Sequence, residues 1–211
     1  MEIAPELQAI SNVSDPELVL ICAAAAERGA AFCRALGRSE QIEWVDASLG
    51  LAWAAAAGNS VQDECAEALD KLDMESQDDE DDSSRPEFYA AQSVALVGNA
   101  LAVSLRPSAA KAEMSINAIR SLLSMLDFKL GGEKPVIVRY GDPSPAPGPL
   151  VQMEIDAERE VIDLLARGAT NFSLGLDLSS ALTPIQASAT EFGARLMPSI
   201  EEVAELRNWE L

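Results

Sequence analysis

The chain has 211 residues, of which 48% are hydrophobic and only 5% aromatic, and its formal net charge is −20. Much of the hydrophobic share is alanine, which favours closely packed helices, and the scarcity of aromatic residues argues against a β-sandwich or barrel. A chain this acidic is repelled by nucleic-acid phosphates and by anionic membranes, so we expect neither as a partner and expect a basic protein instead.

The sequence predicts an all-α fold, a single bundle of about six to eight helices formed by one domain over residues 1–211. The first helix begins at Ser14-Asp15-Pro16-Glu17, a capping box with proline in the first turn, and runs to about Leu36. Its buried stripe should consist of Leu18, Cys22, Ala25, Gly29, Phe32 and Leu36.

Two further helices are expected over 39–58 and over 60 to about 72. The second of these is short and acidic, and it places Glu67 and Lys71 at the i,i+4 spacing of an ion pair. An acidic loop follows at about 74–84, rich in Asp and Ser, which we interpret first as a solvated loop.

Ser84-Arg85-Pro86-Glu87 resembles a second capping box and should open a helix over 85–105. This helix is apolar nearly all round, so we expect it at the centre of the bundle rather than across a membrane. The next helix, over about 108–129, should end at Gly131-Gly132.

The C-terminal third begins with a Pro-rich arm at about 135–149, where five prolines exclude a helix. An amphipathic helix is expected over 150–167, with interrupted helix signals over 170–197 around Leu182-Thr183-Pro184. A last short helix should begin at Ser199 and run close to Leu211.

The three cysteines, Cys22, Cys33 and Cys65, show no metal-binding or redox spacing. Cys22 and Cys33 lie on one expected helix, roughly 16 Å apart at 1.5 Å per residue, too far to form a disulfide. We expect buried free thiols, no signal peptide and a cytoplasmic protein.

The chain contains no histidine, which excludes Ser-His-Asp and Cys-His catalysis, histidine acid–base catalysis and the usual catalytic zinc sites. No phosphate loop, dinucleotide fingerprint or nucleophile elbow is present. We therefore expect a protein that is not an enzyme and needs no cofactor.

The carboxylates of the helix over 150–167 leave one enzymatic alternative open. Glu154 with Glu158, and Asp156 with Glu160, stand at i,i+4 spacing, a pattern that binds Mg²⁺ or Mn²⁺ when other segments add oxygens. All-helical nucleotide pyrophosphohydrolases use acidic helix motifs of this general kind. The interpretation we favour for these four carboxylates is a solvated helix face.

Partner binding is expected at the acidic helix and the loop behind it. The candidate residues are Asp63, Glu64, Glu67, Asp70, Asp78, Asp79, Glu80, Asp81 and Asp82. The helix face is the stronger candidate, because a mobile loop steers a basic partner rather than anchoring it.

Several segments resemble the YjaG-like family of bacterial proteins of unsettled activity. They are Ala26-Glu27-Arg28 with Phe32, Gly50-Leu51-Ala52-Trp53, Glu87-Phe88-Tyr89, and Glu154, Asp156, Glu160, Leu164 and Leu165. The resemblance spans roughly residues 18–166, and Ile155 replaces a tryptophan of the family. It implies an all-helical bundle and no particular activity.

Three functions follow as hypotheses. The first is a non-catalytic interaction protein, most specifically an immunity or inhibitor protein that neutralises a basic toxin or effector domain. The second is the metal-dependent hydrolase on the carboxylates of 150–167. The third is a housekeeping bundle protein that acts through self-association, since the sequence does not determine the oligomeric state.

Overall fold

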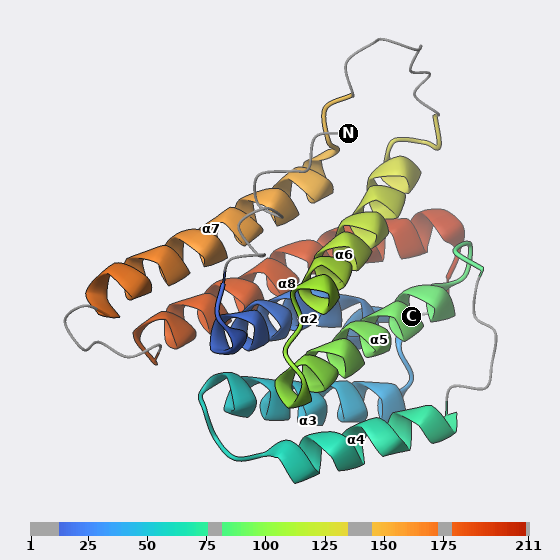
Figure 1. Cartoon of the computed structure of the whole chain (residues 1–211). Coiled ribbons are helices and arrows are strands. Elements are labelled where there is room, and N and C mark those ends of the chain that lie inside the picture. The colour runs from blue at the N-terminus through green and yellow to red at the C-terminus, as the bar shows by residue number, and fades with distance from the viewer. Residues whose placement is uncertain (1–12, 76–81, 135–144, 173–178, 210–211) are drawn as a thin grey trace.

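In a computed structural model, which describes residues 13–75, 82–134, 145–172 and 179–209, the chain is a bundle of α-helices (Figure 1). The described helices are α2 (Asp15–Leu36), α3 (Ser39–Ala56), α4 (Gln62–Glu75), α5 (Pro86–Leu105), α6 (Ala109–Leu130), α7 (Pro149–Phe172) and α8 (Ser179–Arg207). No strand occurs in these ranges, which confirms the all-α bundle of six to eight helices.

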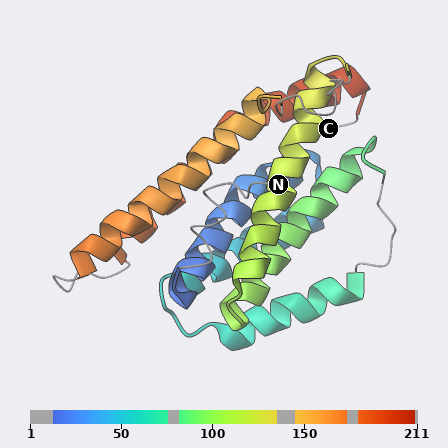
Figure 2. The same cartoon turned by 45° about the horizontal axis from the view of Figure 1, so that its top comes forward.

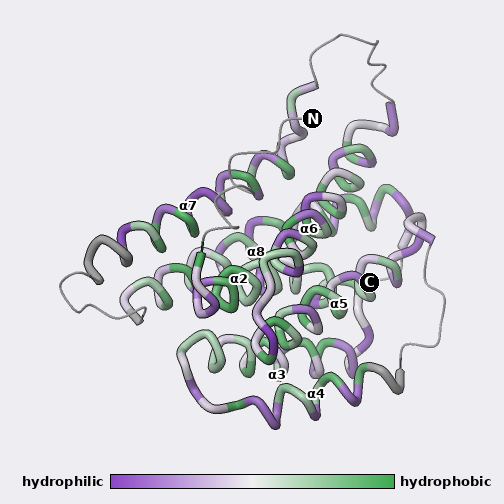
Figure 3. Tube along the Cα trace, viewed as in Figure 1, coloured by the Kyte–Doolittle hydropathy of each residue, from purple (hydrophilic) through white to green (hydrophobic). Residues whose placement is uncertain are grey.

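Helix α2 is enclosed by its neighbours, with α3, α5, α6 and α8 packed around it. All residues from Leu18 to Cys33 are buried, including every residue of the predicted stripe except Leu36, which is half-buried. A run of alanines and Gly29 lets four helices approach its backbone, and the hydropathy colouring shows α2 as mostly hydrophobic (Figure 3). Sequence alone therefore underestimated how deeply this helix is buried.

Helix α5, expected at the centre, contacts α2, α3, α4 and α6 but keeps Ala95 and Leu105 exposed. It is the one helix of the described residues that is long and apolar enough to cross a membrane, and half of that stretch is buried inside the bundle. The core helix of a soluble protein can have the same length and apolar composition, so these two properties do not distinguish a core helix from a membrane-spanning one.

The helix starts agree only in part with the predicted capping boxes. At α2 the Glu17 carboxylate accepts the backbone N–H of Ser14 at 2.6 Å, as predicted. At α5 the N-cap is Arg85, and the capping box expected at Ser84 is wrong. The N–H of Ser84 instead donates to the Asp82 carboxylate at 2.9 Å, and its carbonyl accepts Trp209 Nε1 at 2.9 Å.

Helix α8 corrects the expected interrupted C-terminal region. It runs unbroken through Pro184 and Pro198, although each proline removes one intrahelical hydrogen bond. A continuous apolar stripe crosses both prolines and packs on α2 and α7, so tertiary packing outweighs the local helix-breaking signal. The stripe consists of Ala181, Ile185, Ala189, Phe192, Leu196, Ile200 and Val203.

Two predicted loops lie largely outside the described residues. Of the acidic loop, residues 76–81 are not described, and α4 extends to Glu75 before them. Of the Pro-rich arm, residues 135–144 are not described, residues 145–148 are not helical, and Pro149 already begins α7. Helix α7 also continues to Phe172, beyond the expected end at 167.

The three cysteines are free and buried, as predicted. Burial raises the pKa of the Cys22 thiol to about 12 and that of the Cys33 thiol to about 11. Both groups are therefore protonated at neutral pH, which makes them poor nucleophiles and poor metal ligands.

The close approach of α2 and α5 generates a test of the packing. A Cβ at Gly29 would lie 2.6 Å from Leu96 Cδ1, whereas a Cβ at Gly50 on α3 would meet no atom within 4 Å. We expect Gly29→Leu to lower the free energy of unfolding by about 1–3 kcal/mol through overpacking. The matched change Gly50→Leu should raise it by up to about 1 kcal/mol, because leucine favours a helix more than glycine does. Urea unfolding followed by circular dichroism measures both, and equal effects would contradict the packing described.

Candidate functional site

A buried ion pair joins α2 to α7. The Glu154 carboxylate, 0% exposed, accepts Arg28 Nε at 2.8 and 3.0 Å and Arg28 Nη2 at 2.6 Å. The Arg28 guanidinium also lies over the ring of Phe192, 5.8 Å from its centroid. Each of the two buried charges thus has an opposite charge in hydrogen-bond contact, which is the condition for burying them.

A second ion pair lies one turn along α7. Arg120 of α6 donates from Nε to the Glu158 carboxylate at 2.9 Å, and its Nη2 contacts the other carboxylate oxygen. Burial raises the pKa of Glu158 to about 7; the Arg120 hydrogen bond lowers that pKa, and repulsion from Glu154 raises it. Glu158 therefore changes its protonation close to neutral pH.

These contacts correct the interpretation of the α7 carboxylates. Glu154 and Glu158 are buried and held by arginines, so they do not form the solvated face that we favoured. Asp156 and Glu160 are exposed instead, where Asp156 accepts Gln152 Nε2 at 2.8 Å and Glu160 accepts Ser188 Oγ at 2.7 Å. The four carboxylates do not converge on one site.

The same geometry bears on the metal alternative. Within the described ranges there is no group of three or more His, Cys, Asp or Glu residues that could hold a metal ion. The arginines occupy the carboxylate oxygens that a cation would need. The hydrolase hypothesis therefore gains no support from α7.

Sequence reasoning did not identify the charged partners on α2 and α6. Glu27 is buried beside Arg28, where it accepts Arg34 Nη1 and Trp53 Nε1, each at 3.0 Å. The available signal was the pair Glu27-Arg28 inside the otherwise apolar, alanine-rich stretch 18–33, since charges are rarely buried unless they are paired.

The predicted partner-binding residues of α4 form one exposed face. Asp63, Glu64, Glu67 and Asp70 are all exposed, and Glu67 pairs with Lys71 at 3.0 Å as expected. Purple and green alternate along this helix in the hydropathy colouring (Figure 3), as expected for an amphipathic helix at the edge of the bundle.

The opposite face of α4 holds it against the bundle. Cys65 is buried, and Trp44 Nε1 of α3 donates to the Ala68 carbonyl at 3.2 Å. Gly98 of α5 leaves room for the Leu72 side chain, since a Cβ there would lie 2.8 Å from Leu72 Cδ2. The acidic face of α4 therefore belongs to a helix whose position is fixed by its contacts with α3 and α5.

The loop residues of the prediction are placed only in part. Asp82 is exposed and accepts two hydrogen bonds from Ser84, which lower its pKa. Asp78, Asp79, Glu80 and Asp81 lie outside the described residues. Of the predicted binding residues, those on the acidic face of α4 are therefore the ones whose shared surface the structure describes.

Comparison with known proteins gives no relative. No family model, no curated protein and no solved structure matches the chain. The resemblance to the YjaG-like family stays a prediction.

The buried ion pair predicts different costs for two neighbouring carboxylates. Glu154→Ala should lower the free energy of unfolding by about 3–5 kcal/mol, because Arg28 is left buried without a countercharge. Asp156→Ala, two residues away and exposed, should change it by less than about 0.5 kcal/mol. Arg28→Met combined with Glu154→Met should recover most of the loss. Urea unfolding measures all three, and a small effect at Glu154 would be incompatible with the pair.

Glu158 predicts an unusual pH dependence of stability. Its pKa is about 7 in the folded protein against an ordinary value of 4.5, so the folded state holds a proton that the unfolded chain has released between these values. Its contribution to stability therefore falls as pH rises from about 5 to about 7, by at most about 1.4 kcal/mol per pH unit. Glu158→Gln should remove this slope and the exposed control Glu160→Gln should keep it. The measurement is the urea unfolding midpoint of the parent protein and both variants at several pH values between 5 and 8. If the midpoints of all three proteins changed with pH in the same way, Glu158 would not be the group responsible.

Proposed function

We propose that this protein is a non-catalytic interaction protein that binds a basic protein through the acidic face of α4, formed by Asp63, Glu64, Glu67 and Asp70. In its most specific form the proposal is an immunity or inhibitor protein for a basic toxin or effector domain. A cytoplasmic location accords with the three buried free thiols.

The observation that carries the proposal is the concentration of charge around α4. Residues 39–84 contain fourteen carboxylates and a single basic residue, Lys71. Five of the seven exposed residues among the described side chains of α4 are charged, and four of those are carboxylates. A field of this kind accelerates the encounter with a basic partner and weakens as salt screens it.

The test is a capture from native host lysate at low salt, followed by association and dissociation rates of the captured basic protein. Neutralising α4 with Asp63→Asn, Glu64→Gln, Glu67→Gln and Asp70→Asn should lower the association rate by about tenfold and change the dissociation rate little. High salt should lower the association rate of the parent protein in the same way.

A matched variant distinguishes the effect of the α4 surface on the association rate from the effect of the net charge of the whole protein. The control neutralises four exposed carboxylates of α8 and so makes the same change in net charge: Glu191→Gln, Glu201→Gln, Glu202→Gln and Glu205→Gln. It should lower the association rate far less than the α4 variant. Equal losses in the two variants would overturn the α4 surface, and a rate independent of salt would overturn the electrostatic proposal.

A further inference from the structure

The outward face of α6 is free of exposed charge, in contrast to α4. The exposed residues of α6 are Ala110, Met114, Asn117, Ser121, Ser124 and Phe128. None is charged, although the chain carries a net charge of −20. The charged residues of α6 are all partly buried at its edges. The face shares two features with the core of a protein interface, the lack of exposed charge and the presence of a methionine and a phenylalanine.

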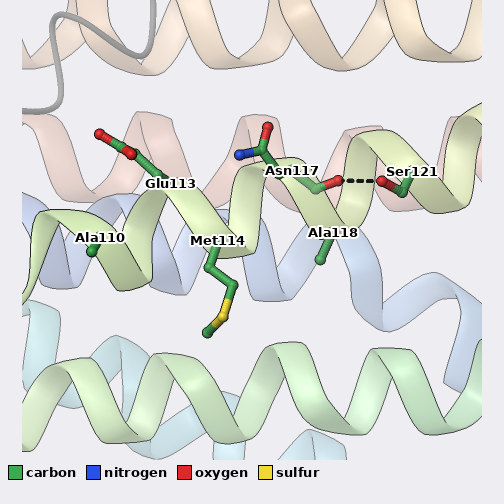
Figure 4. A pocket seen from close by; sticks show the side chains of 6 residues that line it. All are labelled: Ala110, Glu113, Met114, Asn117, Ala118 and Ser121. Carbon is green, nitrogen blue, oxygen red and sulfur yellow. Dashed lines mark hydrogen bonds between the residues drawn. The ribbon is translucent and has the colours of Figure 1, made fainter.

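A shallow cavity lies on this face. It has a volume of about 480 Å³ and is lined by Ala110, Glu113, Met114, Asn117, Ala118 and Ser121. Figure 4 shows Met114 and Ala118 extending toward α5, while Glu113 and Asn117 point to the other side of α6. The small residues around Met114 leave room for an inserted side chain.

Most of the large apolar side chains exposed in the described residues lie on α6 or on the end of α5 that leads into it. Four large hydrophobic side chains are exposed in the described part of the chain, and three of them are Leu105, Met114 and Phe128, at 38%, 55% and 46% exposure. Leu105 ends α5 and the other two lie on α6. The fourth, Leu206, lies on α8.

Helix α5 connects this face to the acidic α4. Gly98 of α5 contacts α4, and the next residue, Asn99, donates to the Lys111 carbonyl of α6 at 2.9 Å. Figures 1 and 2 show α5 between the other two helices. Neighbouring helices lie about 8–10 Å apart, so α4 and α6 are separated by roughly 20 Å, within the breadth of one standard interface.

We infer that the outward face of α6 with Leu105 is the apolar anchor for a basic partner that presents an amphipathic helix, with α4 as the acidic rim of the same interface. This inference rests on the proposed function and adds the kind of segment that binds. Lysine and arginine beside the apolar row of such a helix complement α4, while the row itself meets the outward face of α6, whose fully exposed residues are uncharged. A second copy of this chain would bring a further charge of −20 to the interface, and an anionic membrane would be repelled.

The test uses two synthetic peptides of identical Leu/Lys composition, one with leucines on one helix face and one scrambled. Fluorescence anisotropy at low and at high salt gives the affinity of each. The amphipathic peptide should bind about tenfold more tightly than the scrambled one, because only it buries a leucine row on α6. The α4-neutralised variant should weaken both peptides alike.

Exposed-residue variants locate the anchor without disturbing the core. Met114→Ser with Phe128→Ser should abolish the preference for the amphipathic peptide, and the control Leu206→Ser should retain it. If Leu206→Ser also abolished the preference for the amphipathic peptide, the location of the anchor on α6 would be overturned. The absence of any preference, with salt-dependent binding of both peptides that α4 neutralisation weakens, would overturn the anchor and leave the proposed function standing.

Two further outcomes are distinguishable. If neither peptide binds at low salt, the proposed function itself is overturned, and the anchor with it. If sedimentation shows the chain alone to be a dimer that Met114→Ser with Phe128→Ser dissociates, a second copy covers the face and the inferred partner is wrong.

Discussion

The burial of Arg28 constrains the rest of the bundle. Its surface is 2% exposed, and a charge in that position needs a countercharge from a neighbouring element. Helix α7 supplies it through Glu154, which fixes where α7 lies along α2. The second pair, Glu158 with Arg120, fixes the same helix against α6. An apolar stripe alone tolerates sliding by a turn, whereas two directional pairs on successive turns do not.

Helix α6 also holds the N-terminal end of α7. The Asp127 carboxylate of α6 accepts the backbone N–H groups of Leu150 and Val151, each at 3.1 Å. A carboxylate at that end satisfies donors that no helical residue can reach and complements the helix dipole. Helix α6 therefore holds α7 through its polar edges and keeps charge away from its outward face.

The sequence predicted those features that depend on near neighbours in the chain. The capping box of Ser14, the Glu67–Lys71 pair and the acidic face of α4 all follow from spacings of three or four residues. The Arg28–Glu154 pair joins residues 126 apart, and no local pattern relates them. Helix α8 was misjudged for the related reason that Pro184 is a local signal, while the packing of Ala181 and Ile185 that outweighs it is made with other helices.

The proposed binding surface depends on where the exposed charges lie, and not only on the net charge. Solubility is favoured by a net charge away from zero with the charges spread and both signs interspersed over the surface. Here the charges are segregated: among the side chains that the structure describes, α4 exposes five charged ones and α6 exposes none. The buried charge of Arg28 and the partly buried charge of Arg120 are compensated locally by Glu154 and Glu158, so they contribute little to the outer field. Segregation of this kind is what the proposed surface requires, because in it steering by α4 and anchoring by α6 belong to different helices, with α5 as the spacer between them.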